Sequence, residues 1–119
     1  MEKIERTIRY ANLFNIYKDF LTHNQIEIVG DYFLADLSLS EIAESRNISR
    51  AAVEDAVKKS CQKLDDCEER LHILEKNEKL LKLSAKLKEK CLNTSEFKEI
   101  EDIEKELKNG IWESDWKII

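Results

Sequence analysis

The chain has 119 residues, no proline and only two glycines, at positions 30 and 110. Because glycine and proline are the usual interrupters of helices, this composition favours helix almost throughout. The N-terminal MEKIERTIRY has no apolar run typical of a secretory signal, and no later stretch approaches the roughly 20 apolar residues that span a bilayer. We therefore expect an all-α protein of the cytoplasm, without membrane insertion.

The three cysteines also fit a reducing compartment, since their number is odd and the sequence shows no export signal. Cys61 and Cys67 are six residues apart and so fall on different faces of a helix, and neither belongs to a CxxC motif. Structural metal sites need ligands at closer and more convergent spacing. We expect neither a metal nor another cofactor.

The charge balance argues against a strong nucleic-acid-binding protein, because the net charge is −5. The charge is unevenly distributed, however. Residues 39–63 carry five Lys/Arg and four Asp/Glu, whereas residues 93–119 carry four and eight. The weak positive excess lies in the segment that holds the most informative motif.

The first half of the chain contains several helix signals. A helix is predicted from about Ile4 to Phe20, with an apolar face at three- and four-residue spacing. Two capping boxes follow, in which a Ser or Thr side chain and a Glu or Gln three residues later satisfy each other's backbone N–H groups. They are Thr22 with Gln25, and Ser38 with Glu41.

From Arg50 the sequence shows no helix breaker before Asn93, which predicts one helix of roughly 40 residues, ~60 Å long. Along this predicted helix a row of mainly apolar residues recurs at alternating spacings of three and four, which is the pattern of a heptad seam. Its members are Val57, Ser60, Leu64, Cys67, Leu71, Leu74, Glu78, Leu81 and Ala85. An apolar stripe longer than the head can cover predicts a homodimer, with Leu71 and Leu74 near its centre.

A last helix is expected after Asn93-Thr94-Ser95, with an inward face formed by Phe97, Ile100, Ile103 and Leu107. It should stop at Asn109-Gly110 and fold back over the distal seam, around Leu81 and Leu87. In the acidic tail that follows, Trp112 and Trp116 would share a face if the tail coils. We divide the chain into a head, residues 1–64, and an extension with terminal helix and tail, residues 65–119.

The stretch from Leu37 to Leu64 has the pattern of a helix-turn-helix. Ala43 is the small residue expected where the two helices touch, with Ile42 beneath the first helix. Asn47 stands in the turn, at the position that favours positive φ. Ile48 is expected to fill the turn, and Val53 and Ala56 to anchor the second helix.

In such a unit the second helix enters the DNA major groove and its N-terminal residues meet the base edges. Arg50 could contact guanine, and Ser49 with the helix N-terminus could hold a phosphate. Lysines further along the helix could reach the flanking backbone. The candidate nucleic-acid-binding residues are Ser49, Arg50, Ala51, Ala52, Lys58, Lys59 and Lys63. Glu54 and Asp55 lie among them and would repel phosphates.

Leu21 to Leu64 resembles region 4 of bacterial sigma factors, through LSLSEIAE, the turn and the helix that begins at Ser49. The fuller pattern, from ANLFNIYKDFLTHNQ to the end of that helix, is similar to the YlxM family of small bacterial helix-turn-helix proteins. The resemblance implies a sigma-region-4-like head and a long C-terminal helix. It also implies a regulatory role linked to the signal-recognition-particle pathway. Family members often carry Gln and Tyr where this chain has Ala51 and Glu54.

Two functions remain open at this point. One is a DNA-binding regulator, which Arg50, Lys58 and Lys59 favour. The other is a protein- or RNA-interaction module that keeps the helix-turn-helix as a scaffold and acts on signal-recognition-particle components or RNA polymerase, which Glu54, Asp55 and the acidic tail favour. DNA is the more strongly indicated nucleic acid. An enzyme is not expected, because His23 and His72 are isolated and no nucleophile elbow or phosphate loop occurs.

Overall fold

The computed structural model describes residues 2–108, and all of its regular elements are helical. This confirms the all-α helix-turn-helix prediction. Six α-helices and two short irregular turns of helix follow one another in the described chain. In order they are α1 (Lys3–Tyr17), η1 (Lys18–Phe20), α2 (His23–Val29), η2 (Gly30–Leu34), α3 (Leu39–Arg46), α4 (Arg50–Leu71), α5 (Ile73–Lys90) and α6 (Glu96–Lys108).

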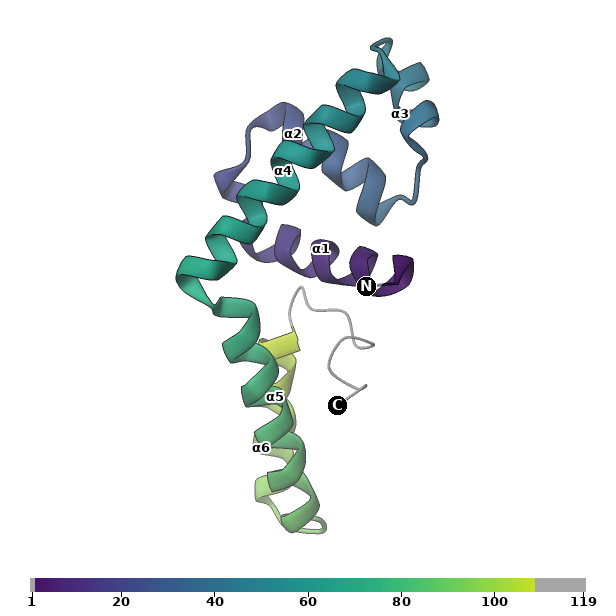
Figure 1. Ribbon diagram of the computed structural model, residues 1–119. Coiled ribbons are helices and arrows are strands. Elements are labelled where there is room, and N and C mark those ends of the chain that lie inside the picture. Colours follow the sequence, from purple (N-terminus) through teal and green to yellow (C-terminus); the bar gives the residue numbers. More distant parts are fainter. Residues whose placement is uncertain (1, 109–119) are drawn as a thin grey trace.

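The helices form a head and a projecting hairpin (Figure 1). In the head, α4 packs against α1, α2 and α3, while α5 and α6 lie antiparallel to each other and extend away from it. The described chain is elongated, with principal extents of 57 × 26 × 25 Å. Contacts between α1 and α5 connect the base of the hairpin to the head.

The helix starts in the head follow the predicted capping chemistry. Both capping boxes are present: the side chains of Thr22 and Ser38 accept from the backbone of Gln25 and Glu41, whose side chains accept in return. The side chain of Ser49 caps α4 by accepting from the Ala52 N–H. Each box satisfies two N–H groups that would otherwise lack a partner at the helix N-terminus.

The hydrophobic core is shared by the head and the first part of the hairpin. It is built mainly from one face of α1, the ends of α2 and η2, the inner side of the helix-turn-helix and the inner side of α4. Leu74 and Leu81 of α5 belong to the same cluster. Its buried members include Leu13, Phe14, Tyr17, Ile28, Val29, Phe33, Ile42, Val53, Val57 and Leu64.

The first helix is shorter than predicted, because α1 ends at Tyr17 and residues 18–20 form a 3-10 turn. Tyr17 is buried, but Phe20 is 54% exposed, so the predicted apolar face does not extend to it. Tightening of the chain at Lys18 rotates Phe20 away from the line that a continuous α-helix would give it.

The predicted 40-residue helix is wrong, because the chain bends at His72 between α4 and α5. His72 has a left-handed conformation, with φ 54° and ψ 31°, and its N–H donates to the Glu68 carbonyl. The carboxylate of Glu68 then turns back and accepts the N–H groups of Leu74 and Glu75, at 3.1 Å each. Glu68 thus replaces a conventional N-cap at the start of α5.

The bend also changes the predicted seam and its dimer. Val57, Ser60, Leu64, Leu74 and Leu81 are buried within this one chain, so they cannot form an interface with a second subunit. Leu71 is exposed, but Leu74, the other residue placed at the dimer centre, lies in the chain's own core. The left-handed residue at position 72 ends the periodicity that would have kept them on one face.

The terminal helix does fold back, and α6 packs along α5. Its buried face contains Ile100 and Glu104, whereas Ile103 and, on α5, Leu87 are exposed, contrary to prediction. The predicted stop at Asn109-Gly110 and the shared face of Trp112 and Trp116 lie outside the described residues.

Candidate nucleic-acid interface

The helix-turn-helix consists of α3, the turn through Asn47 and Ile48, and the first part of α4. Asn47 has the predicted left-handed conformation, with φ 54° and ψ 46°. The turn is closed by the Ile48 N–H, which donates to the Ala43 carbonyl at 3.0 Å. Ala43 and Val53 are buried, as predicted for the helix contact. Ile48 is exposed, so the prediction that it fills the turn is wrong: the backbone hydrogen bond closes the turn without it.

Arg46 fixes the end of α3 to the preceding helical segment. Its guanidinium contacts two carboxylates, Asp31 at 2.7 Å through Nη2 and Glu27 at 2.7 Å through Nη1. The hydrogen bonds to Asp31 and Glu27 raise the pKa of Arg46, and the bond to Asp31 has the larger effect. Because Arg46 is already paired, it positions the helix-turn-helix and is not available to a phosphate.

The seven candidate residues all lie exposed at the start and on the outer side of α4. Ser49 has a double role: its Oγ accepts from the Ala52 N–H at 3.0 Å, which leaves its hydroxyl hydrogen able to donate. At 100° per residue, Ala51 and Lys58 fall near the middle of the exposed side. Lys59 and Lys63 fall on one edge, whereas Arg50 is the first residue of the helix and falls at the angle of the buried Val57 and Cys61. The residues therefore form a surface rather than a pocket.

Acidic side chains interrupt this surface, as the sequence predicted. Glu54 and Asp55 are exposed on the same side of α4. The carboxylate of Asp55 forms an ion pair with Lys59, one turn further along the helix, with 3.0 Å between Oδ2 and Nζ. A phosphate approaching Lys59 must compete with this carboxylate, so Lys58 and Lys63 offer the less hindered cations.

Two basic residues beside Arg50 were missed by the sequence analysis. A cleft of about 440 Å³ between α1 and the start of α3 is lined by Lys3, Arg6, Ser38, Ser40 and Arg50, among others. The guanidinium of Arg6 stacks over the Tyr10 ring, 5.1 Å from its centroid, which helps to hold it in place. The three-residue spacing of Lys3 and Arg6 was a signal for a basic helix face.

The cleft also contains the carboxylates of Asp36 and Glu41, which reduce its positive charge. Hydrogen bonds from the backbone and side chain of Ser38 lower the pKa of Glu41. Glu41 is therefore held ionised as part of the capping box. Lys3, Arg6 and Arg50 supply three cations to this cleft, against the two carboxylates of Asp36 and Glu41.

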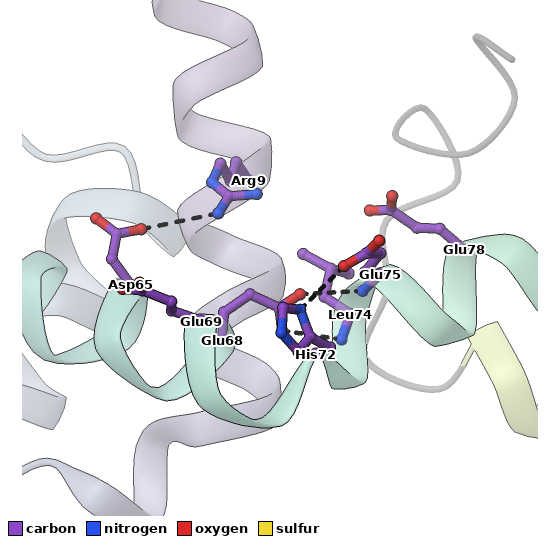
Figure 2. Close-up of a pocket in the computed structure, with 8 residues that line it drawn as sticks. All are labelled: Arg9, Asp65, Glu68, Glu69, His72, Leu74, Glu75 and Glu78. Atoms are coloured by element: carbon purple, nitrogen blue, oxygen red, sulfur yellow. Dashed lines mark hydrogen bonds and ion pairs between the residues drawn. The ribbon is translucent and has the colours of Figure 1, made fainter.

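A second, acidic cleft lies at the bend between α4 and α5 (Figure 2). Its lining residues come from both helices and from Arg9 of α1, and the Arg9 guanidinium reaches Asp65 at 3.8 Å. Possible metal-ligating atoms of Glu68, His72 and Glu75 lie within 4.8 Å of one another.

These three residues already have partners within the chain. Glu68 accepts from Tyr17 and from the backbone of α5, while Nδ1 of His72 lies 3.0 Å from the Glu75 carboxylate. Hydrogen bonds from Lys79 and His72 lower the pKa of Glu75. These hydrogen bonds within the chain explain why Glu68, His72 and Glu75 lie close together. We assign the three residues a structural role, which is to hold the bend between α4 and α5.

Comparison with known proteins identifies the family. Residues 4–105 match the family model UPF0122, described as "Putative helix-turn-helix protein, YlxM / p13 like". The chain belongs to the UPF0122 family. The predicted resemblance to YlxM is thereby confirmed.

Relatives match over most of their length. A UPF0122 protein of Mycoplasma capricolum subsp. capricolum is 38% identical over 114 residues, which cover 96% of this chain and 93% of the relative. A UPF0122 protein of Bacillus cereus strain AH187 is 42% identical over 86 residues, 72% of this chain and 78% of the relative. No solved structure matches the chain.

The family description names a helix-turn-helix and not an enzyme. In residues 2–108, no helix has both the length and the apolar content needed to cross a bilayer. The exposed start of α4 and the adjoining cleft carry the candidate residues of the helix-turn-helix.

Proposed function

We propose that this UPF0122 protein is a cytoplasmic DNA-binding regulator that contacts the duplex through the first four turns of α4. The observation that carries the proposal is the formed helix-turn-helix, in which the N-cap Ser49 and the first residues of the second helix, Arg50, Ala51 and Ala52, are exposed. A helix that is anchored on one side and free on the other is what major-groove entry requires.

Each candidate residue has a specific role in this proposal. Arg50 reads a base edge, Ala51 and Ala52 approach thymine methyl groups, and Ser49 donates to a phosphate. Lys58 and Lys63 hold the backbone beyond the groove, with Lys59 contributing once it leaves Asp55. Lys3 and Arg6 of α1 hold the phosphates on the side of Arg50.

This distribution of charge predicts moderate affinity and a measurable salt dependence. If Lys3, Arg6, Lys58 and Lys63 neutralise about four phosphates, the slope of log K against log salt should be near −3.6. Glu54 and Asp55 oppose non-specific binding, so recognition must depend on the contacts near Arg50.

A titration of a labelled duplex at two salt concentrations tests the proposal, with fluorescence anisotropy as the readout. The double variant Lys58→Ala/Lys63→Ala should weaken binding and flatten the salt slope by about two. The exposed Lys98→Ala on α6 is the matched control and should change neither. If selection from a randomised duplex library at low salt yields no bound sequence, the proposal is contradicted.

A second candidate function is a protein- or RNA-interaction module, and the acidic residues within the α4 surface favour it. Glu54 and Asp55 would then meet basic groups of a partner instead of phosphates. The same titration with an RNA hairpin separates the alternatives, since this module would bind RNA, or neither nucleic acid. The link to signal-recognition-particle components rests on the family resemblance and stays a prediction, as does the homodimer.

A further inference from the structure

The outer side of α5 carries an apolar line that nothing in the described chain covers. Ile73, Leu80, Leu83 and Leu87 are 38%, 48%, 60% and 49% exposed. Their spacings of seven, three and four residues place them along one side of the helix, like the a and d positions of a heptad. This line differs from the seam predicted from sequence, which is buried in the core.

The adjacent helix α6 adds Ile103 to the same side of the hairpin. Leu81 and Ser84 define the buried face of α5, and the Ser84 hydroxyl donates to Glu104 of α6 at 2.9 Å. At 100° per residue, the apolar line lies about a quarter turn from that buried face. Ile103, 57% exposed, lies a similar angle from the buried face of α6. Because the two helices are antiparallel, both displacements point to one side.

The two helices differ in charge. Within α5 there are six lysines and three glutamates, whereas α6 has six acidic residues and three lysines. On the apolar side, Lys90 borders the line on α5 and Lys76 falls within it, while Glu99 and Glu106 border Ile103 on α6. The hairpin therefore presents a basic edge and an acidic edge on either side of an apolar centre.

We propose that this face binds a second copy of the chain, about a two-fold axis that runs along the hairpin. Such an axis places α5 of one subunit over α6 of the other, so basic meets acidic twice. The contact between Ser84 and Glu104 sets the level of the two helices. At that level Leu83 and Leu87 lie opposite the partner subunit's Ile103, and Lys90 lies opposite the partner subunit's Glu99.

Charge selects this arrangement over its main competitor. A two-fold axis across the hairpin would place α5 on the partner's α5 and bring Lys76 and Lys90 together with lysines, which costs energy in a desolvated interface. The axis along the hairpin avoids this and forms a four-helix bundle, a common solution for amphipathic helix pairs.

The proposed axis also places both heads at the same end of the assembly. A dimer with both helix-turn-helix units at one end is compatible with recognition of two half-sites. The inference goes beyond the proposed function. Its test concerns the protein alone, so a failure would leave the proposed DNA contact of α4 standing.

Sedimentation equilibrium of the full chain at tens of micromolar tests the interface. We expect the wild type to be dimeric and Leu83→Glu to raise the dimer dissociation constant by about tenfold or more. Leu71→Glu is the matched control: Leu71 is similarly exposed but lies at the bend, so the dimer should persist. Lys90→Glu and Glu99→Lys should each weaken association, and the double charge swap should restore it.

Several outcomes would overturn the proposal. A monomeric wild type, a dimer that Leu83→Glu leaves unchanged, or a dimer broken by Leu71→Glu would each exclude this interface. A monomer whose melting temperature falls with Leu83→Glu would indicate that another segment of the same chain covers the face. Thermal melts of all variants control for folding, since every substituted side chain is exposed.

Discussion

The hydroxyl of Tyr17 in α1 donates a 2.6 Å hydrogen bond to the carboxylate of Glu68, near the end of α4. The same hydroxyl accepts the N–H of Ile73, the first residue of α5. Glu68 in turn accepts from Leu74 and Glu75. Two side chains thus satisfy three successive backbone donors at the start of α5, and the direction of the hairpin is fixed by a residue of the head.

Replacement of Tyr17 by Phe should therefore destabilise the bend. The variant keeps the buried ring but leaves the Ile73 N–H and one Glu68 lone pair unsatisfied, at a cost of about 1–3 kcal/mol in the free energy of unfolding. Tyr10→Phe is the control, because its hydroxyl bonds only to the partly exposed Asp65, and should cost about 0.5–1.5 kcal/mol. Urea denaturation measures both, and equal losses would contradict the assigned role of Tyr17.

The bend shows where sequence reasoning failed. An N-cap residue followed three positions later by Glu is the pattern of a capping box, and His72 with Glu75 has that spacing. His72 is not a usual N-cap residue, however, and the group that caps α5 is Glu68, four residues earlier. The contribution of Tyr17 depends on tertiary packing, which no periodicity within α4 or α5 encodes.

The helix-turn-helix was predictable because its determinants are local. Capping boxes at Thr22 and Ser38, the left-handed Asn47 and the small Ala43 are specified by residues only a few positions apart. Lys3 and Arg6 were missed as neighbours of Arg50 because packing of α1 against the head, and not local sequence, brings them together. The apolar line on α5 was missed because the predicted seam continued through His72 in the wrong register.

Substitution of Ala43 by Leu tests the close approach of α3 and α4. Ala43 is buried at the helix-turn-helix contact, and the added side chain should overpack it, at a cost of roughly 1–3 kcal/mol in the free energy of unfolding. Ala52→Leu, on the exposed side of α4, is the matched control and should stay within about 0.5 kcal/mol of the wild type. Thermal or chemical denaturation gives both values. Wild-type stability of the Ala43 variant would mean that α3 and α4 do not touch at this residue.

The α5–α6 hairpin should weaken in acid through Glu104. Burial raises the pKa of this carboxyl, but hydrogen bonds from Lys88 and Ser84 outweigh burial and hold the pKa below its ordinary value of 4.5. A lowered folded-state pKa means that the stabilisation is fully present above about pH 4.5 and is lost as the pH falls through the folded-state pKa.

Glu104→Gln should accordingly cost about 1–3 kcal/mol at neutral pH, because the Lys88 ion pair is lost. The difference from the wild type should shrink as the pH falls below 4.5. Amide hydrogen exchange of α6 measures the local effect. Asp102→Asn, on the exposed side of α6, is the control, and an equal pH dependence in both variants would show that Glu104 does not control the hairpin.

The contrast between Arg50 and Lys58 separates base reading from phosphate contact. Arg50 begins α4 next to the cleft, where a guanidinium can form two hydrogen bonds to guanine. Arg50→Ala should therefore cost about 1–3 kcal/mol in binding free energy on the preferred sequence and much less on others, so the sequence preference relaxes.

Lys58 is exposed one helical turn beyond Glu54 and can reach only the DNA backbone. Lys58→Ala should weaken all sequences alike and reduce the salt slope by about one. Binding of each variant to a selected and a scrambled duplex, at two salt concentrations, measures both effects. If neither substitution alters DNA affinity, α4 is a scaffold, and the interaction module becomes the better account of the exposed acidic residues beside it.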